Sequence, residues 1–123
     1  MTYEEKLVQT KSEYPFDKWR EAFDNGLEQY TAENCGKARQ IFDDLIADLI
    51  AKGEAAAESE KIESFKTAIL ALNELNDECD GELIETDERE DLWALTNVIT
   101  VAAGLNPSDY GEGEGLVTEW REW

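Results

Sequence analysis

The sequence predicts an all-α fold, a single-domain helical bundle of four main helices with a docked C-terminal tail. Apolar residues recur at three- and four-residue spacings along most of the chain, which is the period of a helix with one buried face. No segment alternates apolar and polar residues as a half-buried strand does. The 123 residues, of which 41% are hydrophobic, are enough for one packed core. We therefore expect one domain over residues 1–123.

The first third of the chain is predicted to hold a short helix and the first main helix. Residues 3–12 are polar and compatible with a short helix. The first main helix is expected at about 14–28, with Pro15 in its first turn, where the missing N–H is tolerated. Asn25-Gly26 interrupts its apolar stripe. The stripe consists of Phe16, Trp19, Phe23, Leu27 and Tyr30.

Residues 31–52 and 54–78 are predicted to form two neighbouring antiparallel helices. Thr31 can cap the first one, and Gly53 can end it in a left-handed conformation. Glu54 and the three alanines after it favour a second helix that starts at residue 54. The short connection at Gly53 then predicts an αα-hairpin. Three lysines are assigned to outer faces as solubilising residues, namely Lys52, Lys61 and Lys66.

The fourth main helix is expected at residues 87–103, after a break at Asp80-Gly81. Thr86 is the predicted cap, and Gly104 ends the helix. Residues 105–123 form the tail, in which residues 109–115 make an acidic, glycine-rich loop and Thr118 is a possible cap. Two tryptophans so near a terminus indicate that the tail packs on the bundle.

Charge is the most unusual feature of the composition. Thirty Asp and Glu face eleven Lys and Arg, for a formal net charge of −19. Residues 1–66 hold 15 acids and nine bases, whereas residues 67–123 hold 15 acids and only Arg89 and Arg121. Such a surface repels nucleic acid and anionic lipid but attracts basic proteins. We expect a basic protein partner, no direct contact with nucleic acid and no membrane.

The residue types present also narrow the chemistry. Histidine is absent, which removes the commonest general base and transition-metal ligand. Cys35 and Cys79 form no Cys-x-x-Cys pattern and are expected to be reduced thiols. Residues 1–11 lack the apolar run of a signal peptide, and no stretch approaches the ~20 apolar residues that span a bilayer. We expect a cytoplasmic, non-enzymatic protein that uses no cofactor or metal. The sequence does not fix its oligomeric state.

One segment, residues 74–91, concentrates the negative charge, and we call it the acidic belt. Its ten carboxylates face a single cation, Arg89. A surface that serves only solubility usually mixes the two signs, so this density favours a docking face over the alternative of a merely solvated surface. Ion pairs there would speed association and select the partner. The predicted binding residues in the belt are Glu74, Asp77, Glu78, Asp80, Glu82, Glu85, Asp87, Glu88 and Asp91.

The tail supplies the other candidate binding residues. Glu112 and Glu114 lie in its acidic loop and would extend the negative surface. Trp120 and Trp123 have two interpretations, and both stay open. They cover the open end of the core, or they anchor a basic partner, because tryptophan is enriched in interface hot spots and attracts cations over its ring.

Two alternative functions would use the same carboxylates. Residues 76–87 are spaced like an EF-hand loop and would make a degenerate Ca²⁺-binding module. The first, third, fifth, sixth and twelfth positions of that loop would be Asn76, Glu78, Asp80, Gly81 and Asp87. Acid pairs three residues apart could instead hold Mg²⁺ or Mn²⁺ in a carboxylate-based nucleotide phosphohydrolase. These pairs are Glu60/Glu63, Glu82/Glu85, Glu85/Glu88 and Glu88/Asp91. In a chain this acidic, however, chance alone supplies ~7 pairs at this spacing.

The C-terminal third also carries a resemblance. Its pattern consists of Asp87-Glu88-Arg89-Glu90-Asp91-Leu92, then Ala102-Ala103-Gly104-Leu105, then Thr118-Glu119-Trp120-Arg121-Glu122-Trp123. It resembles the C-terminal part of small, acidic, largely uncharacterised bacterial proteins, some of which look like immunity proteins of toxin systems. The resemblance implies a cytosolic protein that neutralises a toxin by occluding it, and it assigns no site residue.

Charge and resemblance together predict a non-enzymatic, acidic protein-binding domain. In this interpretation it is an immunity-type inhibitor of a basic partner such as a nuclease toxin. The acidic belt and residues 109–122 would capture the partner electrostatically. The bound domain would then occlude the partner's basic cleft.

Overall fold

Every regular element of the chain is a helix, and the computed structural model describes all of residues 1–123. The main helices are α2 (Phe16–Asp24), α3 (Ala32–Lys52), α4 (Glu58–Glu78) and α5 (Thr86–Ala102). Shorter helices precede and follow them: α1 (Tyr3–Gln9), η1 (Thr10–Glu13), η2 (Pro107–Asp109), η3 (Gly111–Gly113) and α6 (Val117–Trp120). The predicted all-α bundle of four main helices with a docked tail is confirmed.

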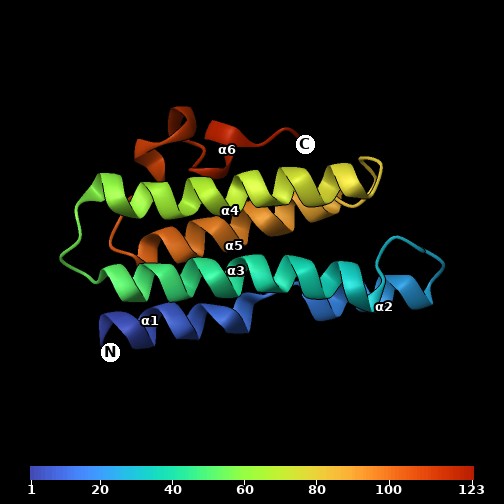
Figure 1. Ribbon diagram of the computed structural model, residues 1–123, viewed down its shortest axis with the longest axis horizontal. Coiled ribbons are helices and arrows are strands. Elements are labelled where there is room, and N and C mark those ends of the chain that lie inside the picture. Colours follow the sequence, from blue (N-terminus) through green and yellow to red (C-terminus); the bar gives the residue numbers. More distant parts are fainter.

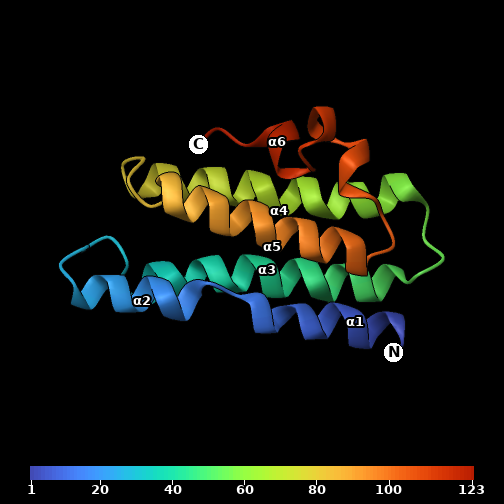
Figure 2. The same ribbon diagram turned by 180° about the vertical axis from the view of Figure 1, so that it is seen from behind.

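The helices lie nearly along one direction, with α3 and α4 side by side and antiparallel (Figure 1). This pair is the predicted αα-hairpin. Helices α1 and α2 follow one another along the outer side of α3, and the tail returns over α4. Helix α5 lies behind the α3–α4 pair, and the view from behind shows it in front (Figure 2). One face of the pair is therefore covered by α5, and the opposite face has no helix over it.

A single apolar core runs between the helices. Its largest fully buried side chains are Trp19, Tyr30, Phe16, Phe42 and Phe65. The rings of Phe16 and Trp19 meet edge to face, with their centroids 5.2 Å apart, which is a favoured geometry for aromatic pairs. Trp120 and Trp123 of the tail are half-buried against the same core. The two tryptophans thus extend the hydrophobic interior under the tail.

Helix α3 follows the sequence signals closely. The Thr31 side chain accepts a hydrogen bond from Asn34 N at 3.0 Å, as an N-cap should. Gly53 ends the helix with φ at +88°, a conformation that costs glycine little. Helix α2 matches less well, because it ends at Asp24 instead of the predicted residue 28. The Asn25-Gly26 break thus ends this helix rather than merely interrupting it.

The start of α4 and the position of Lys61 were predicted incorrectly, for one shared reason. The helix begins at Glu58, and residues 54–57 form a turn. Lys61 is only 5% exposed, not on an outer face. Its Nζ donates to the carbonyl oxygens of Glu54 at 2.8 Å and Ala103 at 2.9 Å, and lies 5.1 Å from the centroid of the Tyr3 ring. The hydrogen bond from Lys61 to Glu54 O holds residues 54–57 in a turn before the helix. The high helix propensity of the three alanines therefore has no effect there.

Burial gives the tyrosines a predictable response to alkali. The pKa of all four phenols is raised above the ordinary 10.0, mainly by burial, and that of Tyr110 reaches about 12. Because each phenol binds its proton more tightly in the folded chain, its contribution to stability is complete below pH 10 and is lost as pH rises further. Ultraviolet titration should show ionisation delayed beyond pH 10 and accompanied by loss of helical circular dichroism. Independent ionisation centred at pH 10 with intact helices would contradict this.

Candidate protein-binding surface

The acidic belt lies at one end of the bundle, where the chain passes from α4 into α5 (Figure 1). Asp80 and Gly81 have φ values of +59° and +74°, and they end α4 as predicted. Aspartate is one of the few side chains that tolerate this left-handed conformation. The exposed carboxylates of the belt are Glu74, Asp77, Glu78, Asp80, Glu82, Glu85, Asp87 and Glu90.

The turn is held in place by groups on both sides. Buried Tyr30 donates its hydroxyl to Leu83 O at 3.0 Å, and Asn76 Oδ1 accepts the N–H of Ile84 at 2.9 Å. Tyr30 lies in the loop formed by residues 25–31. The sequence shows Tyr30 only as the last residue of an apolar stripe and does not indicate its contact with the belt turn. The belt turn is therefore supported by a segment about fifty residues away in the chain.

Glu88 stabilises the start of α5 rather than facing solvent freely. Its Oε1 accepts the N–H of Glu85 at 3.2 Å, and the Glu85 side chain in turn accepts the N–H of Glu88, which is a capping box. Glu85, not the predicted Thr86, is the N-cap residue. Glutamate can replace the usual Ser or Thr at the N-cap here because a carboxylate also favours the positive end of a helix.

Asp91 is also engaged within the fold. Its carboxylate binds Lys18 Nζ at 2.8 Å and accepts the indole N–H of Trp19 at 3.0 Å. These contacts join α2 to α5. Glu78 contrasts with Asp91, because its pairing with Lys37 at 3.6 Å joins two exposed side chains and such surface pairs contribute little. Glu78 remains accessible to a partner, whereas the carboxylate of Asp91 is occupied by the contact between α2 and α5.

The tail acids lie on a loop that two side-chain contacts hold against the bundle. The Tyr110 hydroxyl donates to Glu58, at the end of α4 farthest from the belt turn. Farther along, Trp93 Nε1 on α5 donates to Glu114 O at 2.5 Å. Glu112 and Glu114 are exposed on this loop, and the Trp93 contact places Glu114 beside α5, about one helical turn beyond Glu90 of the belt.

Trp120 and Trp123 cover the core, which corresponds to the first of their two interpretations. Asn73 of α4 fixes this segment, donating to Trp120 O at 3.0 Å and accepting from Glu122 N at 3.0 Å. Trp93 is 43% exposed, and the sequence analysis did not identify it as a surface residue. Its position one residue after the buried Leu92, about 100° around the helix, is the signal that could have revealed it.

The geometry does not favour the two metal-dependent alternatives. No group of three or more Cys, Asp or Glu side chains comes close enough to hold a metal ion. In the EF-hand-like segment, Asn76 belongs to α4 and Asp87 to α5, so the connecting turn is far shorter than a twelve-residue loop. Asn76 also uses its side-chain oxygen for Ile84. Among the acid pairs, Glu88 and Asp91 are committed to the contacts described above.

Comparison with known proteins does not place the chain in a family. No protein-family model matches it, and no curated protein or solved structure matches it either. The resemblance to immunity proteins therefore stays a prediction. None of the helices is both long and apolar enough to span a membrane.

The two thiols give no sign of an activated nucleophile. Cys35 is buried, Cys79 is half-buried, and both are free. Burial is the largest cause that raises the pKa of each thiol above its ordinary value. A raised pKa keeps a thiol protonated at neutral pH, whereas a reactive cysteine needs a lowered one. Neither thiol therefore has the lowered pKa of a reactive cysteine.

Proposed function

We propose that this protein is a stoichiometric binding protein for a basic protein partner, acting as an immunity-type inhibitor of a toxin such as a nuclease. The observation that carries the proposal is the crowding of exposed carboxylates around the belt turn, with Arg89 the only cation in the segment. A nuclease must present a basic surface to its phosphate substrate, and an acidic surface competes for the same groups. Inhibition would follow from occlusion and needs no chemistry by the inhibitor.

The rigidity of the belt turn supports the proposal. Tyr30 and Asn76 fix the turn from two sides, so little conformational entropy is lost when a partner binds. The net charge of −19 supports it as well, because long-range attraction steers a basic partner toward the surface and raises the association rate. Association governed in this way must weaken as salt screens the charges.

Neutralising the centre of the belt should slow capture of the partner. In the triple variant Asp77→Asn, Asp80→Asn, Glu82→Gln, we expect the association rate to fall about tenfold at low salt and to depend less steeply on ionic strength. Asparagine at position 80 preserves the left-handed backbone. The measurement is affinity capture from native lysate at low and high salt, identification of the captured protein, and kinetics with that purified protein.

A second triple variant provides the matched control. Glu4→Gln, Glu5→Gln, Glu13→Gln changes the net charge equally on exposed positions of α1 and η1, away from the belt. It should bind within about twofold of the wild type. If the two triple variants behave alike, or if capture is indifferent to ionic strength, the belt is not a docking face and the proposal fails.

A further inference from the structure

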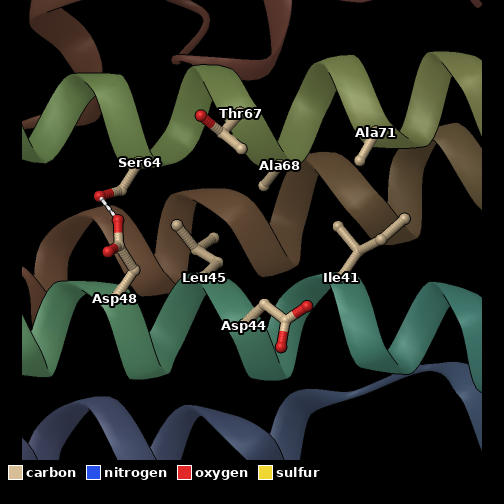
Figure 3. Close-up of a pocket in the computed structure, with 8 residues that line it drawn as sticks. All are labelled: Ile41, Asp44, Leu45, Asp48, Ser64, Thr67, Ala68 and Ala71. Carbon is tan, nitrogen blue, oxygen red and sulfur yellow. Dashed lines mark hydrogen bonds between the residues drawn. The ribbon is translucent and has the colours of Figure 1, made fainter.

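A groove of about 490 Å³ runs between α3 and α4, on the face opposite α5 (Figure 3). Its walls include Ile41 and Leu45 of α3 and Ala68 and Ala71 of α4. A second hollow of about 260 Å³ shares Ile41 and Ala71 with it and continues toward Glu78, at the belt end of α4. The two hollows are neighbours along the helix pair.

Small side chains are the reason for the hollow. At Ala68 and Ala71 α4 offers only methyl groups, while Asp44 on α3 points outward to solvent (Figure 3). Asp48 of α3 crosses the space between the two helices at one end of the groove, where it accepts a hydrogen bond from Ser64 of α4 (Figure 3). The rest of the groove is open. An occupant could therefore approach the helix backbones closely and would need large apolar side chains to fill the groove.

The shape of the groove suits a helix. Its α3 wall extends from Lys37 to Asp48, about 17 Å at 1.5 Å per residue, or three helical turns. A fold without strands offers no sheet edge to which an extended peptide could add. A helix laid along α3 and α4 would pack on the face that α5 leaves open, as helices in bundles do.

Carboxylates line the α3 rim of the groove, where Asp44 and Asp48 stand, whereas the α4 rim carries the neutral Ser64 and Thr67. Glu74 and Glu78 stand on the α4 side of the second hollow. The two lysines that approach the groove stand at its ends, where Lys37 pairs with Glu78 at 3.6 Å and Lys52 with Asp48 at 3.2 Å.

Between these ends the rims carry no cation. Asp44 accepts a hydrogen bond only from Gln40 of its own helix, at 2.7 Å, and Glu74 makes no ion pair. An apolar floor beside an acidic α3 rim, with acids on both sides of the second hollow, is complementary to one kind of helix. That helix has large aliphatic side chains along one face and Lys or Arg where its edges meet these acids.

We propose that this groove seats a basic amphipathic helix of the partner. The inference rests on the proposed function for the basic character of that partner. It adds a second element to recognition, since the belt attracts charge in general whereas the groove selects a helix with a matching apolar face. Partner specificity would then reside on α3 and α4, outside the belt turn.

The test uses a synthetic leucine–lysine peptide of fourteen residues, with leucines at helical spacing, and a scrambled peptide of the same composition. The variant Ala71→Leu fills the groove, and Asp44→Lys reverses the charge of one rim at an exposed position. The control Ala94→Leu makes the same apolar change on an exposed position of α5. Affinity is measured by fluorescence anisotropy, folding by circular dichroism, and the contact residues by amide chemical-shift changes.

We expect the helical peptide to bind at least tenfold more tightly than the scrambled one. Each groove variant should lose at least tenfold in affinity, the control should stay within twofold, and the shifts should map to α3 and α4. Wild-type affinity in both groove variants, or shifts confined to residues 79–91, would overturn the groove proposal. Self-association lost only in Ala71→Leu would assign the groove to a second copy and overturn it as well. The proposed function fails separately, through salt-indifferent capture of the natural partner.

Discussion

Replacing Lys61 with methionine is expected to lower the free energy of unfolding by about 3 kcal/mol, although the two side chains are similar in length. The Lys61 ammonium is the donor for two carbonyl oxygens, one in the turn before α4 and one at the end of α5. Methionine would leave both acceptors without their donor in a nearly water-free site. It would also leave the negative end of the α5 dipole without its counter-charge. This lysine thus connects three parts of the fold, because it also packs over Tyr3 of α1.

The matched control for this variant is Lys66→Met. Lys66 lies on the same helix, and no hydrogen bond or ion pair of its ammonium is present. Both variants make the net charge more negative by one, so general repulsion cancels from the comparison. Urea unfolding followed by circular dichroism gives both midpoints. Equal midpoints for the two variants would show that the buried ammonium contributes nothing specific.

Replacing Gly115 with alanine is expected to detach the tail and to lower stability by about 2–4 kcal/mol. Gly115 has φ at +110°, a conformation that side chains rarely adopt. A Cβ atom there would overlap the side-chain oxygen of Asn97 and lie 3.2 Å from its Cγ. The overlapping atom is the buried amide oxygen of Asn97, so we expect the tail to move rather than the Asn97 side chain alone. Trp120 and Trp123 would then become more exposed.

The readouts for this variant are tryptophan fluorescence and hydrogen exchange of residues 116–123. Gly113→Ala separates the two causes, because Gly113 has a similar φ of +92° but a Cβ atom there would meet no atom closer than 3.9 Å. Gly113→Ala should lower stability by about 1–2 kcal/mol through backbone strain alone, and the tail should stay docked. A red-shifted emission in both variants, or in neither, would show that overlap with Asn97 is not what displaces the tail.

Local signals in the sequence determined the parts of the fold that were predicted correctly. Thr31, Gly53 and the Asp80-Gly81 pair act through their own backbone conformations, so their effects can be inferred without a tertiary structure. The exposed carboxylates of the belt turn follow from the same local break.

Long-range contacts account for the parts that were missed. The Lys61 ammonium binds a carbonyl 42 residues away, and Asp91 binds Trp19 across 72 residues. Composition and periodicity treat such residues as ordinary surface charges. Glu88 differs, because its partner Glu85 is only three residues away, but Glu85 is not one of the usual N-cap residues of a capping box, so the pair could not be told from the other acid pairs at this spacing. The groove required coordinates, since it depends on which face α5 leaves open.

The crowded carboxylates of the belt have a consequence for how the free and bound protein respond to salt. Like charges on one rigid turn raise the free energy of the folded state, and mobile cations relieve that repulsion. Adding salt should therefore stabilise the unbound protein while it weakens the complex. A partner that supplies its own cations would replace the dissolved ones, so binding should increase thermal stability most in dilute buffer. As ionic strength rises, the affinity for the partner would then fall while the stability of the free protein would rise.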